Sequence, residues 1–281
     1  MKSQRIEGEG GKQEAACRIN LMFLKVMNFD IAYQVTGDGP ETVVILQGWG
    51  TSYHAYDSIT EILKSRYRVV QFDFPGFGDS TEPSEGWSVN DYTAFFIELM
   101  QTLNIERAVL LGHSFGGRVI LKLTGYASLP FSIEKIVMVD SAGIMPKRSF
   151  RQKLRTRCYK LLKKLFGFKL VYKLFPDFID AWRRRQGSED YRNASPVMRQ
   201  TLVKAVNEDL TELLPGVQPE CLLIWGANDT ATPVSDGKKM EQMMPNAGLA
   251  VIQNAGHFSF IDQPGVFRRI LEIYLGVDNQ L

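Results

Sequence analysis

Short apolar runs alternate with segments of helical periodicity along most of this chain, and that alternation constrains its fold more than any other feature. Runs of four to six apolar residues are typical of strands buried in a parallel sheet. We therefore predict an α/β fold, with a mostly parallel central sheet and helices on both faces. The first two strands, joined by a turn at Asn28-Phe29-Asp30, should form an antiparallel hairpin at one edge. The predicted strands lie at 21–26, 31–36, 42–46, 67–72, 107–111, 135–139, 221–225 and 249–252, and the predicted helices at 56–64, 90–103, 115–126 and 264–274.

This alternation breaks between residues 144 and 214, where no convincing strand occurs and apolar residues recur at helical spacing. We predict that residues 144–214 form a cap of two to four helices over the carboxyl edge of the sheet. The cap would be inserted in a core made of residues 17–143 and 215–281. The polar, glycine-rich residues 1–16 are expected to be disordered.

Composition is that of a soluble globular protein, with 44% hydrophobic and 23% charged residues. The three cysteines, Cys17, Cys158 and Cys221, include no C-x-x-C pair. This usage favours a reducing compartment and argues against a disulfide framework or a zinc site. The N-terminal residues lack the apolar core of a signal peptide, and no apolar run reaches about 18 residues. We therefore expect a cytoplasmic protein that uses no metal and no cofactor.

Charge is concentrated in one part of the predicted cap. Between Lys147 and Arg185 there are 14 Lys or Arg residues and only two acids, although the net charge of the chain is +2. Three interpretations stay open: a solvated face of the cap helices, attraction of an anionic substrate or acyl carrier, or contact with an anionic membrane surface. No motif for nucleic-acid binding is present. The sequence leaves open whether the protein is a monomer or a homodimer.

The strongest catalytic signal is a G-x-S-x-G motif around Ser114, in the segment Gly112-His113-Ser114-Phe115-Gly116. It follows a predicted strand directly and opens a predicted helix, which is the context that a nucleophile elbow requires. The alternative, a glycine-rich turn with an incidental serine, is the weaker interpretation because both flanking elements are present. We predict that Ser114 is a nucleophile.

A serine nucleophile needs a general base and an acid that orients this base. The chain has three histidines, and His257 alone follows the last predicted strand, at the carboxyl edge of the sheet. Asp229 follows the penultimate strand, so the order Ser114, Asp229, His257 matches one of the known triad orders. Asp140, at the end of the strand before the cap, is the competing acid.

The reaction would also need two donors for an oxyanion. We predict the backbone N–H groups of Phe115 and of Trp49, which lies in the loop after the third strand. Substrate contacts are expected from Trp49, His113 and Phe258, with the Trp49 indole as a wall of the acyl pocket. The ring of His113 is also expected to diverge from the serine into the packing behind it.

Five motifs carry a resemblance to a known family: Gln47-Gly48-Trp49-Gly50, Asp73-Phe74-Pro75-Gly76-Phe77-Gly78-Asp79-Ser80, Gly112-His113-Ser114-Phe115-Gly116-Gly117, Trp225-Gly226-Ala227-Asn228-Asp229 and Gly256-His257. With them the chain resembles the α/β-hydrolase superfamily over roughly residues 21–275. The resemblance implies the predicted fold, with the cap as its variable part, and a serine hydrolase.

Two narrower resemblances point to different substrates. Residues 188–194 and 207–210 look similar to hydrolases that cleave 2-hydroxy-6-oxo-dienoates at a carbon–carbon bond. Those enzymes commonly have asparagine where this chain has His113, and often tryptophan where it has Phe258. The Gly48-Trp49-Gly50 loop instead resembles a carboxylesterase that removes a methyl group from pimeloyl carrier protein.

The prediction is therefore hydrolysis of a carboxylic ester, or a related acyl bond, of a small-molecule substrate through an acyl-enzyme. A carbon–carbon bond hydrolase and a non-catalytic ligand receptor on the same fold are the alternatives. Ser114 argues against dehalogenases and epoxide hydrolases of this type, which use aspartate as the nucleophile. Cofactor-free oxygenases and perhydrolases, which keep the serine triad, stay open.

Overall fold

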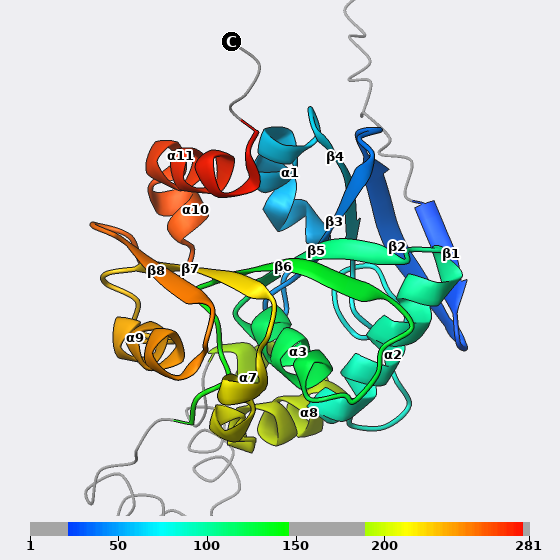
Figure 1. Ribbon diagram of the computed structural model, residues 1–281. Helices are drawn as coiled ribbons and strands as arrows, with labels where there is room; N and C mark the ends of the chain where they lie inside the picture. The colour runs from blue at the N-terminus through cyan, green and yellow to red at the C-terminus, as the bar shows by residue number, and fades with distance from the viewer. Residues whose placement is uncertain (1–21, 146–188, 278–281) are drawn as a thin grey trace, which may run out of the picture.

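The computed structural model describes residues 22–145 and 189–277, which form one eight-stranded sheet with helices on both faces (Figure 1). The strand order is β1-β2-β4-β3-β5-β6-β7-β8. Strand β2 runs antiparallel to β1 and β4, and all other neighbours are parallel. The predicted fold class is confirmed. The strands are β1 (Met22–Val26), β2 (Phe29–Thr36), β3 (Glu41–Leu46), β4 (Tyr67–Phe72), β5 (Arg107–His113), β6 (Ser132–Val139), β7 (Glu220–Gly226) and β8 (Ala247–Ile252).

Two apolar layers separate the sheet from its helices. Alternate residues of a strand point to opposite faces, so Val44 packs in the layer that includes α2 and α3, whereas Val43 packs in the layer that includes α1 and α11. Figure 1 shows α1, α10 and α11 on one face and α2, α3 and α9 on the other. The helical elements are η1 (Tyr53–Tyr56), α1 (Asp57–Leu63), α2 (Val89–Thr102), α3 (Phe115–Thr124), α7 (Glu189–Asn193), α8 (Pro196–Asn207), η2 (Thr211–Gly216), α9 (Val234–Met243), α10 (Ser259–Asp262) and α11 (Pro264–Leu275).

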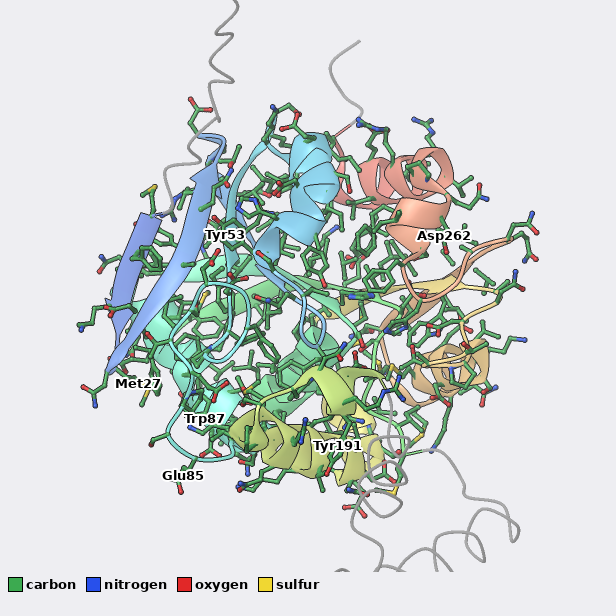
Figure 2. All side chains as sticks on the ribbon, turned by 180° about the vertical axis from the view of Figure 1, so that it is seen from behind. Met27, Tyr53, Glu85, Trp87, Tyr191 and Asp262 are labelled. Carbon is green, nitrogen blue, oxygen red and sulfur yellow. The ribbon has the colours of Figure 1, made fainter. Side chains whose placement is uncertain are left out.

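The edge hairpin differs from the prediction in its turn. Val26 pairs with Phe29, so the turn consists of Met27 and Asn28, and Phe29 and Asp30 already belong to β2. Met27 adopts a φ of 54° and projects at the outer edge of the sheet (Figure 2). A two-residue hairpin turn requires positive φ, and a methionine gives no sequence signal for that conformation.

Helix α9 was not predicted from the sequence. It contains Gly237, which favours a break in a helix. In the structure a Cβ at Gly237 would lie 2.8 Å from the Trp225 ring. The glycine therefore lets the helix approach the sheet closely, which is a tertiary requirement that local propensity does not reveal.

Only part of the predicted cap is described. Residues 144–145 and 189–214 contain α7, α8 and most of η2, whereas the basic stretch and the N-terminal residues expected to be disordered lie outside the described residues. Helix α8 begins with a Ser195 cap, whose hydroxyl accepts a hydrogen bond from the Met198 N–H, followed by Pro196 at its first position. Among the described helices, none has the length and apolar character needed to cross a membrane.

Candidate active site

Ser114 lies on a sharp turn between β5 and α3. Its φ of 47° is strained for a residue with a side chain, and hydrogen bonds on both sides hold it there. The Ser114 N–H donates to the Val139 carbonyl at 3.1 Å, and its carbonyl accepts from Ala142 at 3.0 Å. A Cβ at Gly116 would lie 2.1 Å from the Leu46 carbonyl oxygen, so only glycine allows the helix to start this close to β3.

Ser114, His257 and Asp229 form one hydrogen-bonded chain at the carboxyl ends of the strands. The Ser114 Oγ lies 2.9 Å from His257 Nε2, and His257 Nδ1 lies 2.8 Å from Asp229 Oδ2. The turn after β7 supplies the aspartate, and the loop after β8 supplies the histidine. The structure thus brings together the three residues that the sequence selected.

Asp229 is held as a carboxylate by several donors. Its side chain is fully buried, which alone would raise its pKa, but hydrogen bonds from His257 and Thr232 outweigh this and keep the pKa below its usual value. The N–H groups of Ala231 and Thr232 donate to it at 2.8 and 3.0 Å, and the Thr232 hydroxyl at 2.8 Å. Sequence reasoning missed Thr232, although its position three residues after the aspartate is typical of a turn closed by the side chain.

The competing acid, Asp140, has a different environment. It accepts hydrogen bonds from the Gly226 N–H at 2.7 Å and from the Ser259 hydroxyl and N–H at 2.6 and 3.1 Å. Burial raises its pKa to about 6 despite these bonds. Within the described chain it makes no hydrogen bond to His257, so its contacts tie the end of β6 to β7 and α10.

His113 supports the base loop from behind the serine. Its Nε2 lies 2.8 Å from the backbone carbonyl of His257, and its Nδ1 lies 2.9 Å from the Tyr56 hydroxyl. Burial and the nearby His257 ring lower its pKa to about 3, so the ring is neutral. A carbonyl only accepts, so Nε2 carries the proton, and Nδ1 accepts from the Tyr56 hydroxyl. Both ring nitrogens of His113 are thus engaged in hydrogen bonds within the protein. No sequence signal had pointed to Tyr56.

The two predicted oxyanion donors lie beside Ser114 and line the same cavity. The Gly48 N–H donates to the Tyr56 hydroxyl at 2.6 Å, which fixes the loop that carries Trp49. The Trp49 ring packs edge-on against Phe115 with centroids 5.6 Å apart. Neither the Trp49 nor the Phe115 N–H donates a hydrogen bond to another residue of the described chain.

The cavity at this site has a volume of about 560 Å³ and a largely apolar wall. Ser114 and His257 open onto it, and the three residues predicted to contact substrate, Trp49, His113 and Phe258, are among its lining residues. The Phe258 ring packs on His113 with centroids 4.9 Å apart. The remaining lining side chains include Ile144, Leu202, Ala205, Val206 and the charged Arg118, Asp190 and Asp236.

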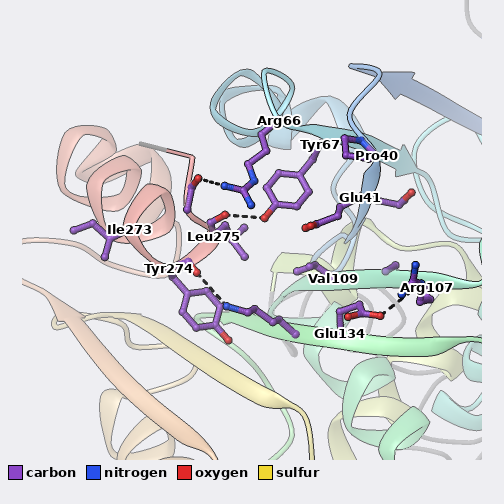
Figure 3. A pocket seen from close by; sticks show the side chains of 14 residues that line it. Pro40, Glu41, Arg66, Tyr67, Arg107, Val109, Glu134, Ile273, Tyr274 and Leu275 are labelled. Atoms are coloured by element: carbon purple, nitrogen blue, oxygen red, sulfur yellow. Dashed lines mark hydrogen bonds and ion pairs between the residues drawn. The ribbon is translucent and has the colours of Figure 1, made fainter. Parts of the chain in front are cut away.

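A second cavity, of about 650 Å³, lies at the opposite end of the sheet, where β3, β4, β5 and β6 begin (Figure 3). Its described lining contains Glu134 and Arg107, whose charged groups lie 3.9 Å apart, and Tyr67, which donates to the Leu275 carbonyl at 2.7 Å. No serine, histidine or cysteine is among the described residues that line it. Within the described ranges, no group of three or more His, Cys, Asp or Glu could hold a metal ion.

Comparison with known proteins identifies the family of the chain. The sequence pattern of the Alpha/beta hydrolase family matches residues 43–270, most of the chain. The chain belongs to this family. As a member with hydrolase and esterase relatives, it is an enzyme.

Individual relatives are distant but cover most of the chain. It is 26% identical to the pimeloyl-[acyl-carrier protein] methyl ester esterase of Nitrosomonas europaea, over 84% of this chain and 96% of that one. It is also 26% identical to a 2-hydroxy-6-oxononadienedioate/2-hydroxy-6-oxononatrienedioate hydrolase of Paraburkholderia phymatum, over 88% and 91% of the two chains. A solved hydrolase structure from Pseudomonas aeruginosa superposes with a TM-score of 0.70 at 24% identity, covering 92% of this chain and 99% of that one.

Proposed function

We propose that Ser114, His257 and Asp229 act as a catalytic triad that hydrolyses a carboxylic ester, or a related acyl bond, of a small molecule. The observation that carries this proposal is the unbroken contact from hydroxyl to imidazole to carboxylate, at 2.9 and 2.8 Å, on the wall of a cavity. These distances lie within the range that a nucleophile and its general base require.

The mechanism is a two-step acyl transfer. Ser114 Oγ attacks the substrate carbonyl while His257 Nε2 accepts its proton, and the buried Asp229 carboxylate stabilises the imidazolium. The Trp49 and Phe115 N–H groups stabilise the oxyanion of the tetrahedral intermediate, and loss of one such donor typically costs about 10²–10³-fold in kcat. His257 then protonates the leaving alcohol, and in the second step it activates water to release the acid.

A largely apolar cavity and the esterase relative both support a carboxylic ester as the substrate class. The relative that acts on 2-hydroxy-6-oxononadienedioate supports a second candidate, hydrolysis of a carbon–carbon bond in a dienoate by the same three residues. Turnover of a 2-hydroxy-6-oxo-dienoate at a rate well above that of methyl or p-nitrophenyl esters would favour the second candidate.

The substitution Ser114→Ala tests the proposal. We expect hydrolysis of short p-nitrophenyl esters to fall by at least about 10⁴-fold, because the nucleophile is lost while the fold is kept. Ser132→Ala is the matched control, since this serine begins β6 at the other end of the sheet. A fluorophosphonate probe should label wild type and Ser132→Ala but not Ser114→Ala. Equal ester hydrolysis by Ser114→Ala and wild type would refute the triad, and a folded wild type that the probe does not label would contradict Ser114 as an activated nucleophile.

A further inference from the structure

Arg118 is a charged residue in the cavity wall that the proposed triad does not use. It lies on α3 four residues after Ser114, so the two Cα atoms are about 6 Å apart along the helix. The side chain is only 6% exposed and lines the same cavity as Ser114 and His257. A buried guanidinium thus lies one helical turn from the proposed nucleophile.

The contacts of Arg118 leave its charge unbalanced. One terminal nitrogen, Nη1, donates to the backbone carbonyl of Glu208 at 2.8 Å, a neutral acceptor. The Glu208 carboxylate pairs instead with Lys122 at 2.6 Å. The carboxylate of Asp209 accepts from both donors of Thr211, at 3.1 and 2.6 Å. Among the described residues, no carboxylate forms an ion pair with Arg118.

Such a charge is costly to bury. Burial lowers the pKa of Arg118, and the nearby carboxylates of Glu208 and Asp209 offset this only in part. A buried cation without a counter-ion destabilises a fold, and this cost is removed when an anion enters the site. Guanidinium has five N–H donors in a planar fork that matches the two oxygens of a carboxylate.

A purely structural role would be to cap the end of α8. The Glu208 carbonyl follows the last residue of that helix, and a cation is favourable there. This contact uses one of the five N–H groups, so it leaves most of the fork for a second acceptor. Capping explains the bond to Glu208 but does not explain why the group lines the cavity.

We propose that Arg118 binds a carboxylate carried by the substrate, a few carbon atoms from the carbonyl that Ser114 attacks. The substrate would then be the ester of a dicarboxylic acid, or another ester with a free carboxylate, which rests on the esterase function proposed above. Two acids also line the cavity, Asp190 on α7 and Asp236 on α9. Their negative charges repel an anion from their parts of the cavity wall, so the carboxylate of the substrate is favoured near Arg118.

Matched substrates test the proposal directly. Methyl hydrogen succinate, glutarate and adipate carry a carboxylate, whereas methyl succinamate, glutaramate and adipamate are neutral and nearly isosteric. For at least one chain length, we expect wild-type kcat/KM to favour the acid over the amide by about tenfold or more. Arg118→Gln should lower that ratio by about 10- to 100-fold, the usual effect of losing a charged hydrogen-bonded pair.

Two further variants separate binding from structure. Arg118→Lys keeps the charge and should retain part of the preference. Lys64→Met removes a charge that lies outside the cavity lining and pairs with Glu61, so it should leave the ratio unchanged. The proposal fails if wild type does not prefer the acids at any length, if Arg118→Gln lowers turnover of acid and amide equally, or if Lys64→Met changes the ratio as much. The acid preference is measured on wild type alone, so the proposal can be refuted even if Arg118→Gln folds poorly.

A binding measurement separates this proposal from the esterase function. Isothermal titration of the Ser114→Ala protein with methyl hydrogen glutarate and methyl glutaramate requires no turnover. Tighter binding of the acid, lost in the double variant with Arg118→Gln, would support the carboxylate site even if wild type hydrolysed no ester. Equal binding of acid and amide together with rapid hydrolysis of both would overturn the carboxylate site and leave the esterase function intact.

Discussion

The two ends of the central sheet carry cavities of similar size but of different character. The cavity at the amino ends of the strands is the larger, about 650 Å³ against 560 Å³. It is lined by an exposed pair, Arg107 and Glu134, with side chains 76% and 50% exposed. The cavity at the carboxyl ends is lined by the backbone-strained Ser114 and by His257, whose partner Asp229 is fully buried. The volume of a cavity therefore does not locate the candidate active site. In a parallel sheet the loops that leave the carboxyl ends of the strands converge, and these loops carry the residues proposed to react.

The largest effect is expected at Asp229, the proposed orienting acid at the carboxyl end of the sheet. Asp229→Asn removes the carboxylate that accepts from His257 Nδ1 and favours the wrong imidazole tautomer. We expect ester kcat/KM at neutral pH to fall by about 10³–10⁴-fold, with the protein still folded by circular dichroism.

Asp140→Asn sharpens this test because Asp140 lies at the same end of the sheet. It contacts Gly226 and Ser259, so we expect a lower melting temperature and less than about a tenfold loss in kcat/KM. If Asp140→Asn cost as much activity as Asp229→Asn, the assignment of the acid would be wrong.

The next effect concerns stability and pH. His113→Asn cannot bridge Tyr56 and the His257 carbonyl, so it should lower the free energy of unfolding by about 2–3 kcal/mol at pH 7. The folded-state pKa of His113 is about 3, below the unfolded value of 6.5, so the unfolded wild type binds the extra proton between these values. Wild type therefore loses roughly 1.4 kcal/mol per pH unit relative to the variant as pH falls below 6.5.

Urea unfolding of wild type and His113→Asn between pH 4 and pH 8 measures this difference. The gap between the two proteins should narrow on acidification. The raised pKa of Asp140, about 6, acts on both proteins and cancels in the comparison. A gap that stays constant with pH would mean that His113 is not held neutral by the fold.

The smallest effect is expected at the amino-end cavity. Glu134→Gln removes an exposed partner of Arg107 at 3.9 Å, so the free energy of unfolding should change by no more than about 0.5 kcal/mol. Ester kcat/KM should equal that of wild type within error. A marked loss of activity would break the comparison, because it would show that the two ends of the sheet are coupled.

The fold class and the three proposed triad positions could be predicted because both depend on local patterns. Apolar runs mark buried strands: Ser114 follows such a run directly, and Asp229 and His257 lie in the loops that follow two others. Parallel strands bring their carboxyl ends together whatever the details of packing. The Met27-Asn28 turn had no comparable signal, since its conformation is imposed by the pairing of β1 with β2.

Contacts that depend on tertiary packing could not be predicted. Tyr56 and His113 are 57 residues apart, and their hydrogen bond exists only because the fold brings the end of η1 to the end of β5. In the sequence, Arg118 has no feature that distinguishes it from other polar residues of the helix after the G-x-S-x-G motif. Its burial follows from the approach of residue 208, which is 90 residues away in the sequence.

The neutral state of His113 limits how much positive charge this end of the sheet can hold. The rings of His113 and His257 lie 5.0 Å apart, and each would repel a proton on the other. The neutral ring of His113 already donates its one N–H to the backbone carbonyl of His257. In the proposed mechanism, a proton taken from the Ser114 hydroxyl therefore stays on His257 and does not pass to His113.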